Sequence, residues 1–398
     1  MGLSPSKTYQ GPNRFATAAA LAEEFVYMKG EPSTVILASG DTYQNALASS
    51  ILSQRYQAPT LLLGSRGVDK STYDFLTKYR ESIDKIIFVG NSDNYSPELF
   101  SYLEACILDG RPDPGVFAPY EALKQGSKGE NVRLFHQKLK EKNYYRGKVD
   151  DVFDAESEVA LRLFLYNNNL LMDSSLSEEA WTMIKNGQGR TIDRSAREKI
   201  TIKLPYHSQI DGIYAWVSCV PTSLLMALQN KGYATEYNLK SFLEFIPRHP
   251  TNPAKGYAGN PYKRTAVSPS MWPNVQKQTA DMLGARSSDL TGAPMYALED
   301  ELYMNNPVVI IPTLYWRAPD IRTYRVEGKP TKLYYNLHGT VLTGYDPATG
   351  KYQVTDPYNH SSWGGKPGVP HIMWIEGPTM TKSNETQKQA FTVWSENK

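Results

Sequence analysis

The chain has 398 residues, a hydrophobic content of 40% and a formal net charge of +2, which predict about two or three folded domains and exclude wholesale disorder. Its two cysteines, Cys106 and Cys219, cannot build a disulfide framework or a four-cysteine zinc site. The near-zero charge disfavours a nucleic-acid partner, and no apolar run is long enough for a membrane span.

The first block of the chain alternates between helix and strand patterns. Helices are predicted at residues 17–27, 45–54, 71–79 and 96–106, and strands at 34–38, 59–63 and 85–90. Strands separated by single helices imply right-handed crossovers and therefore a parallel sheet. Cys106 falls late in the last of these helices among apolar neighbours, a setting typical of an inert core thiol.

Four separated motifs in this block resemble the type 2 cell-wall-binding repeat family. Residues 11–18 look like the opening signature of that family, and residues 38–47, 59–62 and 88–90 follow in the family's order. Asn45 departs from the family, which usually has Asp there. The resemblance implies a Rossmann-like α/β module over residues 1–112 that holds proteins on Gram-positive wall polymers. A nucleotide-binding domain is disfavoured because no Gly-rich phosphate loop follows the first strand.

The number of these modules suggests an oligomer. Family members usually carry three copies packed about a pseudo-threefold axis, whereas this chain carries one. We therefore hypothesise a homotrimer formed through the N-terminal module. Light scattering on the full-length protein tests this hypothesis, and a clean monomer at micromolar concentration would reject it.

The second block, residues 119–190, is short and helical, with turn and linker residues at 109–115 and 186–190 on either side. Helices are predicted from Gly126, from Ser157 and from Ser177, which has two acidic residues in its first turn. This three-helix bundle resembles the type 1 peptidoglycan-binding domain in its glycine-rich start, its Gly147 turn and Trp181. Asp151 and Leu165 depart from the family pattern. The alternative is a spacer without a ligand.

Cys219 has the sequence context of a reactive thiol. It directly precedes a strong helix-forming run at residues 224–228, and Pro221 is tolerated only in the first turn of such a helix. A thiol at a helix N-terminus has a lowered pKa because the macrodipole favours the thiolate, which is the nucleophilic form. The pattern therefore predicts Cys219 as a nucleophile, whereas a lone cysteine before a helix is more often a core residue.

A histidine and an aspartate are predicted to meet at the open end of a hairpin. His338 lies at the start of one strand, and Asp356 ends the next strand, at 351–355, across a turn at 346–350. This arrangement suits an imidazole base and the carboxylate that orients it. Gln209, ten residues before Cys219, has an amide suited to an oxyanion hole. Alone, His338 would be an ordinary strand histidine and Asp356 a turn residue.

Seven segments of this third block resemble the bacteriocin-processing-like (family thirty-nine, second type) cysteine peptidases, which are distant relatives of papain. They occur in family order at residues 205–209, 216–223, 256–262, 289–292, 306–309, 338–345 and 354–357. The resemblance implies an α+β papain-like domain over residues 198–398, with Cys219 as nucleophile, His338 as base, Asp356 as orienting group and Gln209 as oxyanion donor. Ser218 departs from the family's frequent Gly.

Other chemistry in this block is disfavoured. A zinc site built from His207, His338, His360 and His371 lacks metal-ligand spacing, so neither a metal nor a cofactor is expected. The long loop at residues 248–271, rich in Pro, Gly and Asn, is predicted to face the substrate.

The predicted function is a peptidoglycan-directed hydrolase that cleaves a peptide or amide bond in the stem or cross-bridge. Its partners would be peptidoglycan and secondary wall polymers, and its location the cell wall or the extracellular space. Because residues 1–7 lack a signal-peptide pattern, a phage endolysin released from the host cytoplasm by a holin is slightly favoured over a secreted autolysin. The alternatives are a non-catalytic wall-anchored adaptor and a peptidase that processes protein leaders.

Overall fold

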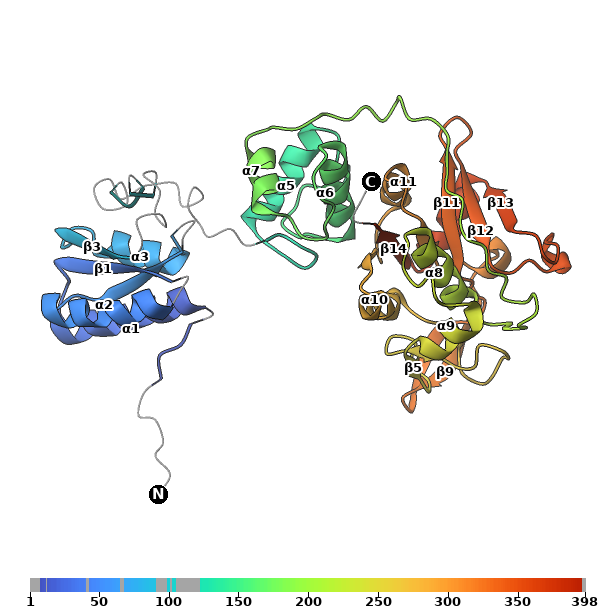
Figure 1. The fold of residues 1–398 in the computed structure, drawn as a ribbon, viewed down its shortest axis with the longest axis horizontal. Coiled ribbons are helices and arrows are strands. Elements are labelled where there is room, and N and C mark those ends of the chain that lie inside the picture. Colours follow the sequence, from blue (N-terminus) through green and yellow to red (C-terminus); the bar gives the residue numbers. More distant parts are fainter. Residues whose placement is uncertain are drawn as a thin grey trace, which may run out of the picture. The chain divides into compact units, whose positions relative to one another are not determined.

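The protein divides into two compact units, Met1–Glu121 and Ala122–Lys398. The structure, a computed structural model, describes residues 8–11, 13–40, 43–64, 68–90, 99–100, 102–104 and 122–395, with the backbone alone for 43–46 (Figure 1). Cys106, predicted to be an inert core thiol, lies outside the described residues. No helix among the described residues is long and apolar enough to cross a bilayer.

The first unit alternates helices with parallel strands. Its elements in chain order are α1 (Arg14–Lys29), β1 (Thr34–Ser39), α2 (Tyr43–Tyr56), β2 (Thr60–Leu63), α3 (Lys70–Lys78) and β3 (Lys85–Val89). The described strands form a parallel sheet in the order β2-β1-β3, as expected for strands separated by single helices. The Rossmann-like assignment stays a prediction.

The opening motif of this unit caps its first helix. The Asn13 side chain accepts a hydrogen bond from the Ala16 N–H at 2.8 Å, which satisfies one of the helix's free donors. The Arg14 guanidinium donates to the Gly40 carbonyl at 2.6 Å, immediately after β1. The motif therefore ties the start of α1 to the carboxyl end of the central strand.

The second unit begins with three helices: α5 (Glu130–Glu141), α6 (Ala155–Asn167) and α7 (Glu178–Lys185). A capping box between Asp154 and Ser157 starts α6, and the Ser177 hydroxyl caps α7 by accepting from the Ala180 N–H at 3.2 Å. Trp181 is buried, as its apolar helix face predicts. We call residues 122–190 the helical segment; its designation as a peptidoglycan-binding bundle stays a prediction.

The remainder of the second unit is built around a seven-stranded antiparallel sheet. The order is β13-β12-β11-β8-β14-β7, with β4 pairing β11. The strands are β4 (Ile200–Thr201), β7 (Arg286–Asp289), β8 (Val308–Ile310), β11 (Thr340–Asp346), β12 (Lys351–Asp356), β13 (His371–Ile375) and β14 (Ala390–Trp394). The core is made of apolar residues of β8 and β11 and the buried face of α8 (Cys219–Asn230).

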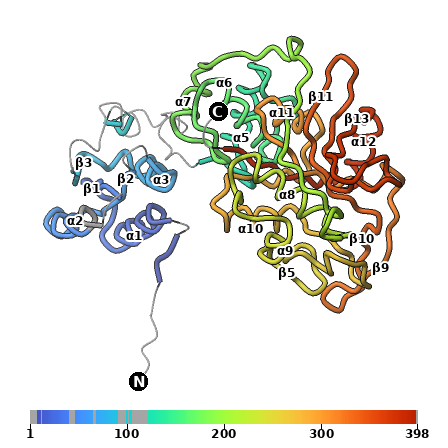
Figure 2. The backbone as a smooth tube through the Cα atoms, turned by 45° about the vertical axis from the view of Figure 1, so that its right-hand side comes forward, coloured from blue at the N-terminus to red at the C-terminus, as the bar shows by residue number. Residues whose placement is uncertain are grey.

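Four more helices and two small sheets complete this unit. The helices are α9 (Leu239–Phe245), α10 (Pro273–Met282), α11 (Met295–Tyr303) and α12 (Gly377–Glu385), and the short 3₁₀ turns are η2 (Leu314–Trp316) and η3 (Ser361–Trp363). Strands β5 (Arg248–His249) and β6 (Tyr257–Ala258) are parallel, and β9 (Ile321–Val326) pairs with β10 (Lys329–Tyr334) as a hairpin. The tip of this hairpin lies near the loop after β5 (Figure 2). In that loop Lys255 pairs with Glu327 of the hairpin turn at 2.6 Å.

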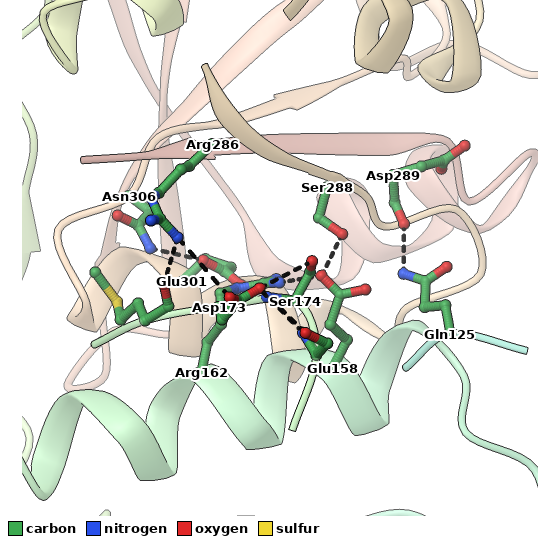
Figure 3. Close-up of polar contacts among 12 residues, drawn as sticks. Gln125, Glu158, Arg162, Asp173, Ser174, Arg286, Ser288, Asp289, Glu301 and Asn306 are labelled. Atoms are coloured by element: carbon green, nitrogen blue, oxygen red, sulfur yellow. Dashed lines mark hydrogen bonds and ion pairs between the residues drawn. The ribbon is translucent and has the colours of Figure 1, made fainter. Parts of the chain in front are cut away.

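A buried charge network joins the helical segment to this sheet. Arg162 on α6 is fully buried and bonds Glu158 on its own helix and Glu301 on α11 (Figure 3). Glu158 also accepts from Ser288 on β7, and Glu301 accepts from the Asn306 amide at 2.9 Å. The helical segment and the sheet therefore share one interior and form a single compact unit. The division of the chain into domains at residues 1–112, 119–190 and 198–398 stays a prediction.

Candidate active site

The Cys219 thiol lies at the N-terminus of α8, as predicted. Ser218 precedes the helix with its own hydroxyl turned back to the Ala215 carbonyl at 2.8 Å, so no side chain caps the free N–H groups of the first turn. Pro221 occupies that first turn, where its missing N–H leaves no bond unmade. The partial positive charge of the helix start is thus left to act on the sulfur of Cys219, a partly exposed residue.

His338 and Asp356 form a buried pair beside the thiol. His338 lies two residues before β11, and Asp356 is the last residue of β12, so the antiparallel pairing of these strands brings them together. The His338 Nε2 lies 2.8 Å from Asp356 Oδ1 and 2.9 Å from Oδ2. Both side chains are buried. Because Nε2 is held by the carboxylate, Nδ1 is the ring nitrogen left for the thiol.

Electrostatics favour an ion pair between sulfur and imidazole. Burial acts to raise the pKa of the Cys219 thiol, but the hydrogen bond and charge of His338 outweigh it, so the pKa lies below its ordinary value. Burial acts to lower the pKa of His338, but the Asp356 carboxylate and the hydrogen bond to Cys219 raise it to about 10. Between these two pKa values the pair exists as thiolate and imidazolium, which is the reactive form of a cysteine nucleophile.

The reactivity of the thiol should therefore depend on His338 and on pH. Because burial alone raises the thiol pKa, His338→Ala should shift the midpoint of Cys219 alkylation to higher pH and slow the reaction at pH 7 by about 10-fold or more. The measurement is the pH dependence of iodoacetamide labelling, with mass spectrometry separating Cys219 from Cys106. An unchanged Cys219 profile in the variant would refute the ion pair.

Gly339 allows the strand to approach the helix. A Cβ at this position would lie 2.5 Å from the Val220 Cα and 2.6 Å from the Val220 backbone nitrogen, inside the first turn of α8. The backbone of Gly339 also hydrogen-bonds the Cys219 sulfur, which further lowers the thiol pKa. His338 can therefore lie this close to Cys219 only if the next residue, at position 339, is glycine.

Gly339→Ala is expected to separate the two catalytic candidates. The new methyl group meets backbone atoms that cannot rotate away, so β11 or α8 must shift, at a cost of about 1–3 kcal/mol of stability. A shift of about 1 Å should lower hydrolysis by about 100-fold. Gly232→Ala is a matched control, because its φ of 84° disfavours alanine but no atom lies within 4 Å of the added carbon. The control should lose stability alone; equal activity losses in both variants would contradict the prediction.

Gln209 lies in the same pocket as the thiol. Its side chain is buried, and its Nε2 donates to the Trp216 carbonyl at 3.0 Å, three residues before Cys219. Its Oε1 is buried without a hydrogen-bond partner among the described residues. The four residues predicted from the sequence are thus brought together, and their individual roles stay predictions.

The carboxylate of Asp356 is also held by groups that the sequence patterns did not indicate. The indole Nε1 of Trp363 donates to Oδ2 at 2.9 Å, and the backbone N–H of Tyr358 donates to Oδ1 at 2.8 Å. The Trp363 ring packs edge-on against Tyr315, with ring centroids 3.7 Å apart. Trp363 follows β12 by a short loop, and no motif spacing links it to Asp356 in advance.

A cavity of about 280 Å³ opens beside Cys219 and His338. Its walls include five aromatic side chains, those of Trp216, Tyr315, Tyr334, Tyr335 and Tyr358. The predicted substrate-facing loop contributes Arg264, Ser268 and Pro269. No cluster of three or more metal-ligating side chains occurs in the part of the chain that the structure describes.

Comparison with known families identifies two regions of the chain. Residues 201–371 match the model of the Peptidase_C39 like family, and residues 8–100 match that of Cell wall binding domain 2. The chain thus carries a cell-wall-binding domain and a C39-like peptidase domain, which confirms the resemblances predicted for the first and third blocks. The resemblance of residues 119–190 to the type 1 peptidoglycan-binding domain stays a prediction.

Individual relatives are distant. The uncharacterized protein YvpB of Bacillus subtilis is 26% identical over 164 residues, which make up 39% of this chain; the chain spans 64% of that relative's length. A candidate C39-like peptidase from Bacillus anthracis has a TM-score of 0.40 and 22% identity, covering 50% of this chain and 98% of its own. Xylellain, a cysteine protease from Xylella fastidiosa, has a TM-score of 0.27 and 14% identity, covering 51% and 89%.

Proposed function

We propose that this protein is a wall-associated cysteine peptidase that hydrolyses a peptide or amide bond in the stem or cross-bridge of peptidoglycan. The observation that carries the proposal is the buried His338–Asp356 pair beside Cys219, in a chain that also carries a cell-wall-binding domain. Such a domain raises the local concentration of the wall polymer around the peptidase. The location that follows is the cell wall or the extracellular space.

The proposed reaction has two steps. The Cys219 thiolate attacks the carbonyl carbon, and the oxyanion is held by the backbone N–H of Cys219 and the amide of Gln209. His338, with Nε2 held by Asp356, gives its Nδ1 proton to the leaving amine as the C–N bond breaks. The neutral imidazole then takes a proton from water, which attacks the thioester, releases the carboxylate product and restores the thiolate–imidazolium pair.

Two other functions compete with this proposal. A wall-anchored adaptor would use the peptidase fold for binding alone, and a leader-processing peptidase would cut proteins and leave the wall intact. The lowered pKa of Cys219 disfavours the adaptor, because a thiol kept only for packing has no need of a charged partner. The cell-wall-binding domain disfavours the leader peptidase.

Mass spectrometry of digested Gram-positive walls tests the proposal. Purified walls incubated with the full-length protein should release fragments that carry one new amine and one new carboxylate at the cleaved bond. A leader peptidase would release no such fragments but would cut a protein substrate. An adaptor would pellet with the walls and release nothing.

A further inference from the structure

An arginine with no carboxylate partner among the described residues lies on the wall of the candidate active-site cavity. Arg264 is exposed and lines the cavity together with Cys219 and His338. Its guanidinium lies over the ring of Tyr335, 4.5 Å from the centroid, and Tyr335 lines the same cavity. Stacking on an aromatic ring orients a guanidinium while leaving its N–H groups free to donate in the ring plane.

The charge of Arg264 is not neutralised within the described residues. Arg322 also lies over Tyr335, at 3.3 Å, but its guanidinium is paired with Asp320 at 2.7 Å. No comparable ion pair holds Arg264 among the residues that the structure describes, and no Asp or Glu lines the cavity. The Cys219 thiolate, the His338 imidazolium and the Asp356 carboxylate behind it already form a charge-paired set, so Arg264 is a cation on the cavity wall that this set does not hold.

The loop that carries Arg264 is fixed relative to the thiol. The Pro261 carbonyl accepts from the Val217 N–H at 3.0 Å, and the Tyr257 hydroxyl donates to the Val217 carbonyl at 2.8 Å. Val217 is two residues before Cys219, so the part of the loop that precedes Arg264 is anchored next to the nucleophile. Tyr335 is anchored separately, by its N–H to the Asp320 carbonyl at 2.7 Å. The backbone that carries Arg264 and the residue that its guanidinium stacks on are therefore both tied to the site.

We propose that Arg264 and Tyr335 form a subsite for a carboxylate on the peptide that is cleaved. The proposal deepens the proposed function and rests on it, because it names acidic peptides as the substrate class of the same site. A guanidinium recognises a carboxylate through two parallel N–H donors, and partial enclosure by aromatic walls strengthens that bond. Peptidoglycan stem peptides carry carboxylates both on side chains and at the C-terminus. A carboxylate of either kind offers the two oxygens that a guanidinium binds.

Binding to a catalytically inactive protein tests the subsite without relying on turnover. The probes are stem peptides in three forms: all carboxyls free, the C-terminal carboxyl amidated, and the side-chain carboxyl amidated. The proteins are full-length Cys219→Ala alone and combined with Arg264→Gln, Arg264→Lys or Arg325→Gln. Arg325 on β9 is the matched control: its guanidinium donates to the Gly328 carbonyl at 3.1 Å and does not line the cavity, so its loss removes the same charge elsewhere.

Arg264→Gln should weaken binding of the free peptide by about 10-fold or more. With Arg264 in place, the free peptide should bind more tightly than one of the two amidated peptides, and that peptide identifies the carboxylate that is bound. Arg264→Gln should abolish this difference in affinity. Arg264→Lys should keep part of the preference, because the charge remains but the paired donors are lost. Arg325→Gln should change nothing. Equal affinity for all three peptides, or a preference that survives in Arg264→Gln, overturns the proposal.

Turnover by the wild-type protein separates this outcome from a failure of the proposed function. Cleavage of the free peptide without any effect of Arg264→Gln keeps the peptidase and rejects the subsite. Binding that depends on Arg264, without cleavage of stem peptides, keeps the carboxylate subsite and rejects the hydrolase.

Discussion

Cys219→Ala is expected to abolish wall hydrolysis while leaving attachment to walls intact. The variant removes the sulfur that lies beside the His338–Asp356 pair, and without it the thioester cannot form. Losing the nucleophile of a catalytic set lowers the rate by at least about 1,000-fold. The measurement is the loss of turbidity of a Gram-positive wall suspension, together with the fraction of protein that pellets with the walls.

Cys219→Ser is the companion variant. A hydroxyl is nearly the size of a thiol, but His338 cannot ionise it at neutral pH, so this variant should also be inactive. Because neither change is large, both proteins should keep the unfolding temperature of the wild type. If Cys219→Ala clears walls as fast as the wild type, the peptidase mechanism is wrong; if neither clears walls and both pellet with them, the adaptor is the better account.

Arg162→Met is expected to destabilise the second unit by about 3–5 kcal/mol. The side chain of Arg162 is fully buried, with its guanidinium bonded to Glu158 and Glu301 and lying 4.6 Å from the centroid of the Trp394 ring. Methionine fills much of the volume but leaves two buried carboxylates without a cation. Burial already raises the pKa of Glu158, and the loss of Arg162 should raise it further.

Thermal unfolding of the full-length protein measures this effect. Arg133→Met is the matched control, because Arg133 pairs with Glu130 on the exposed face of α5 and such a pair contributes at most about 1 kcal/mol. A triple variant, Arg162→Met with Glu158→Leu and Glu301→Leu, should recover much of the stability, since the three buried charges of this network are removed together. Equal unfolding temperatures for Arg162→Met and the wild type would show that the network contributes nothing.

This network bears on how the helical segment and the peptidase region are organised. The helical segment was predicted as a separate module with its own boundaries, yet its Arg162 is buried against α11 of the peptidase region. Further ion pairs join Arg194 and Arg197, which follow the helical segment, to Asp300 on the same helix. We therefore expect that deleting the helical segment would expose Glu301 and its apolar surroundings and would destabilise the peptidase domain along with it.

Local patterns were sufficient to predict much of the candidate site. Cys219 precedes a helix-forming run, so its thiol is predicted at the start of a helix. That prediction depends only on residues within one or two helical turns of Cys219. His338 and Asp356 meet because His338 lies just before one strand and Asp356 ends the next, across a short turn, so their contact also follows from nearby sequence. The predicted order of strands and helices in the first unit is local in the same sense, and its described strands are parallel.

Other features depend on contacts between segments far apart in the chain, which only the tertiary structure decides. Gly339 is needed because Val220, more than a hundred residues earlier, lies where a side chain would stand. The ion pair of Arg162 with Glu301 on α11 and the stacking of Arg264 on Tyr335 likewise have no periodic pattern in the sequence that predicts them. The sequence alone determined which elements form and which residues carry reactive groups. Packing decided which of those groups meet, because side-chain contacts depend on how whole elements are placed against one another.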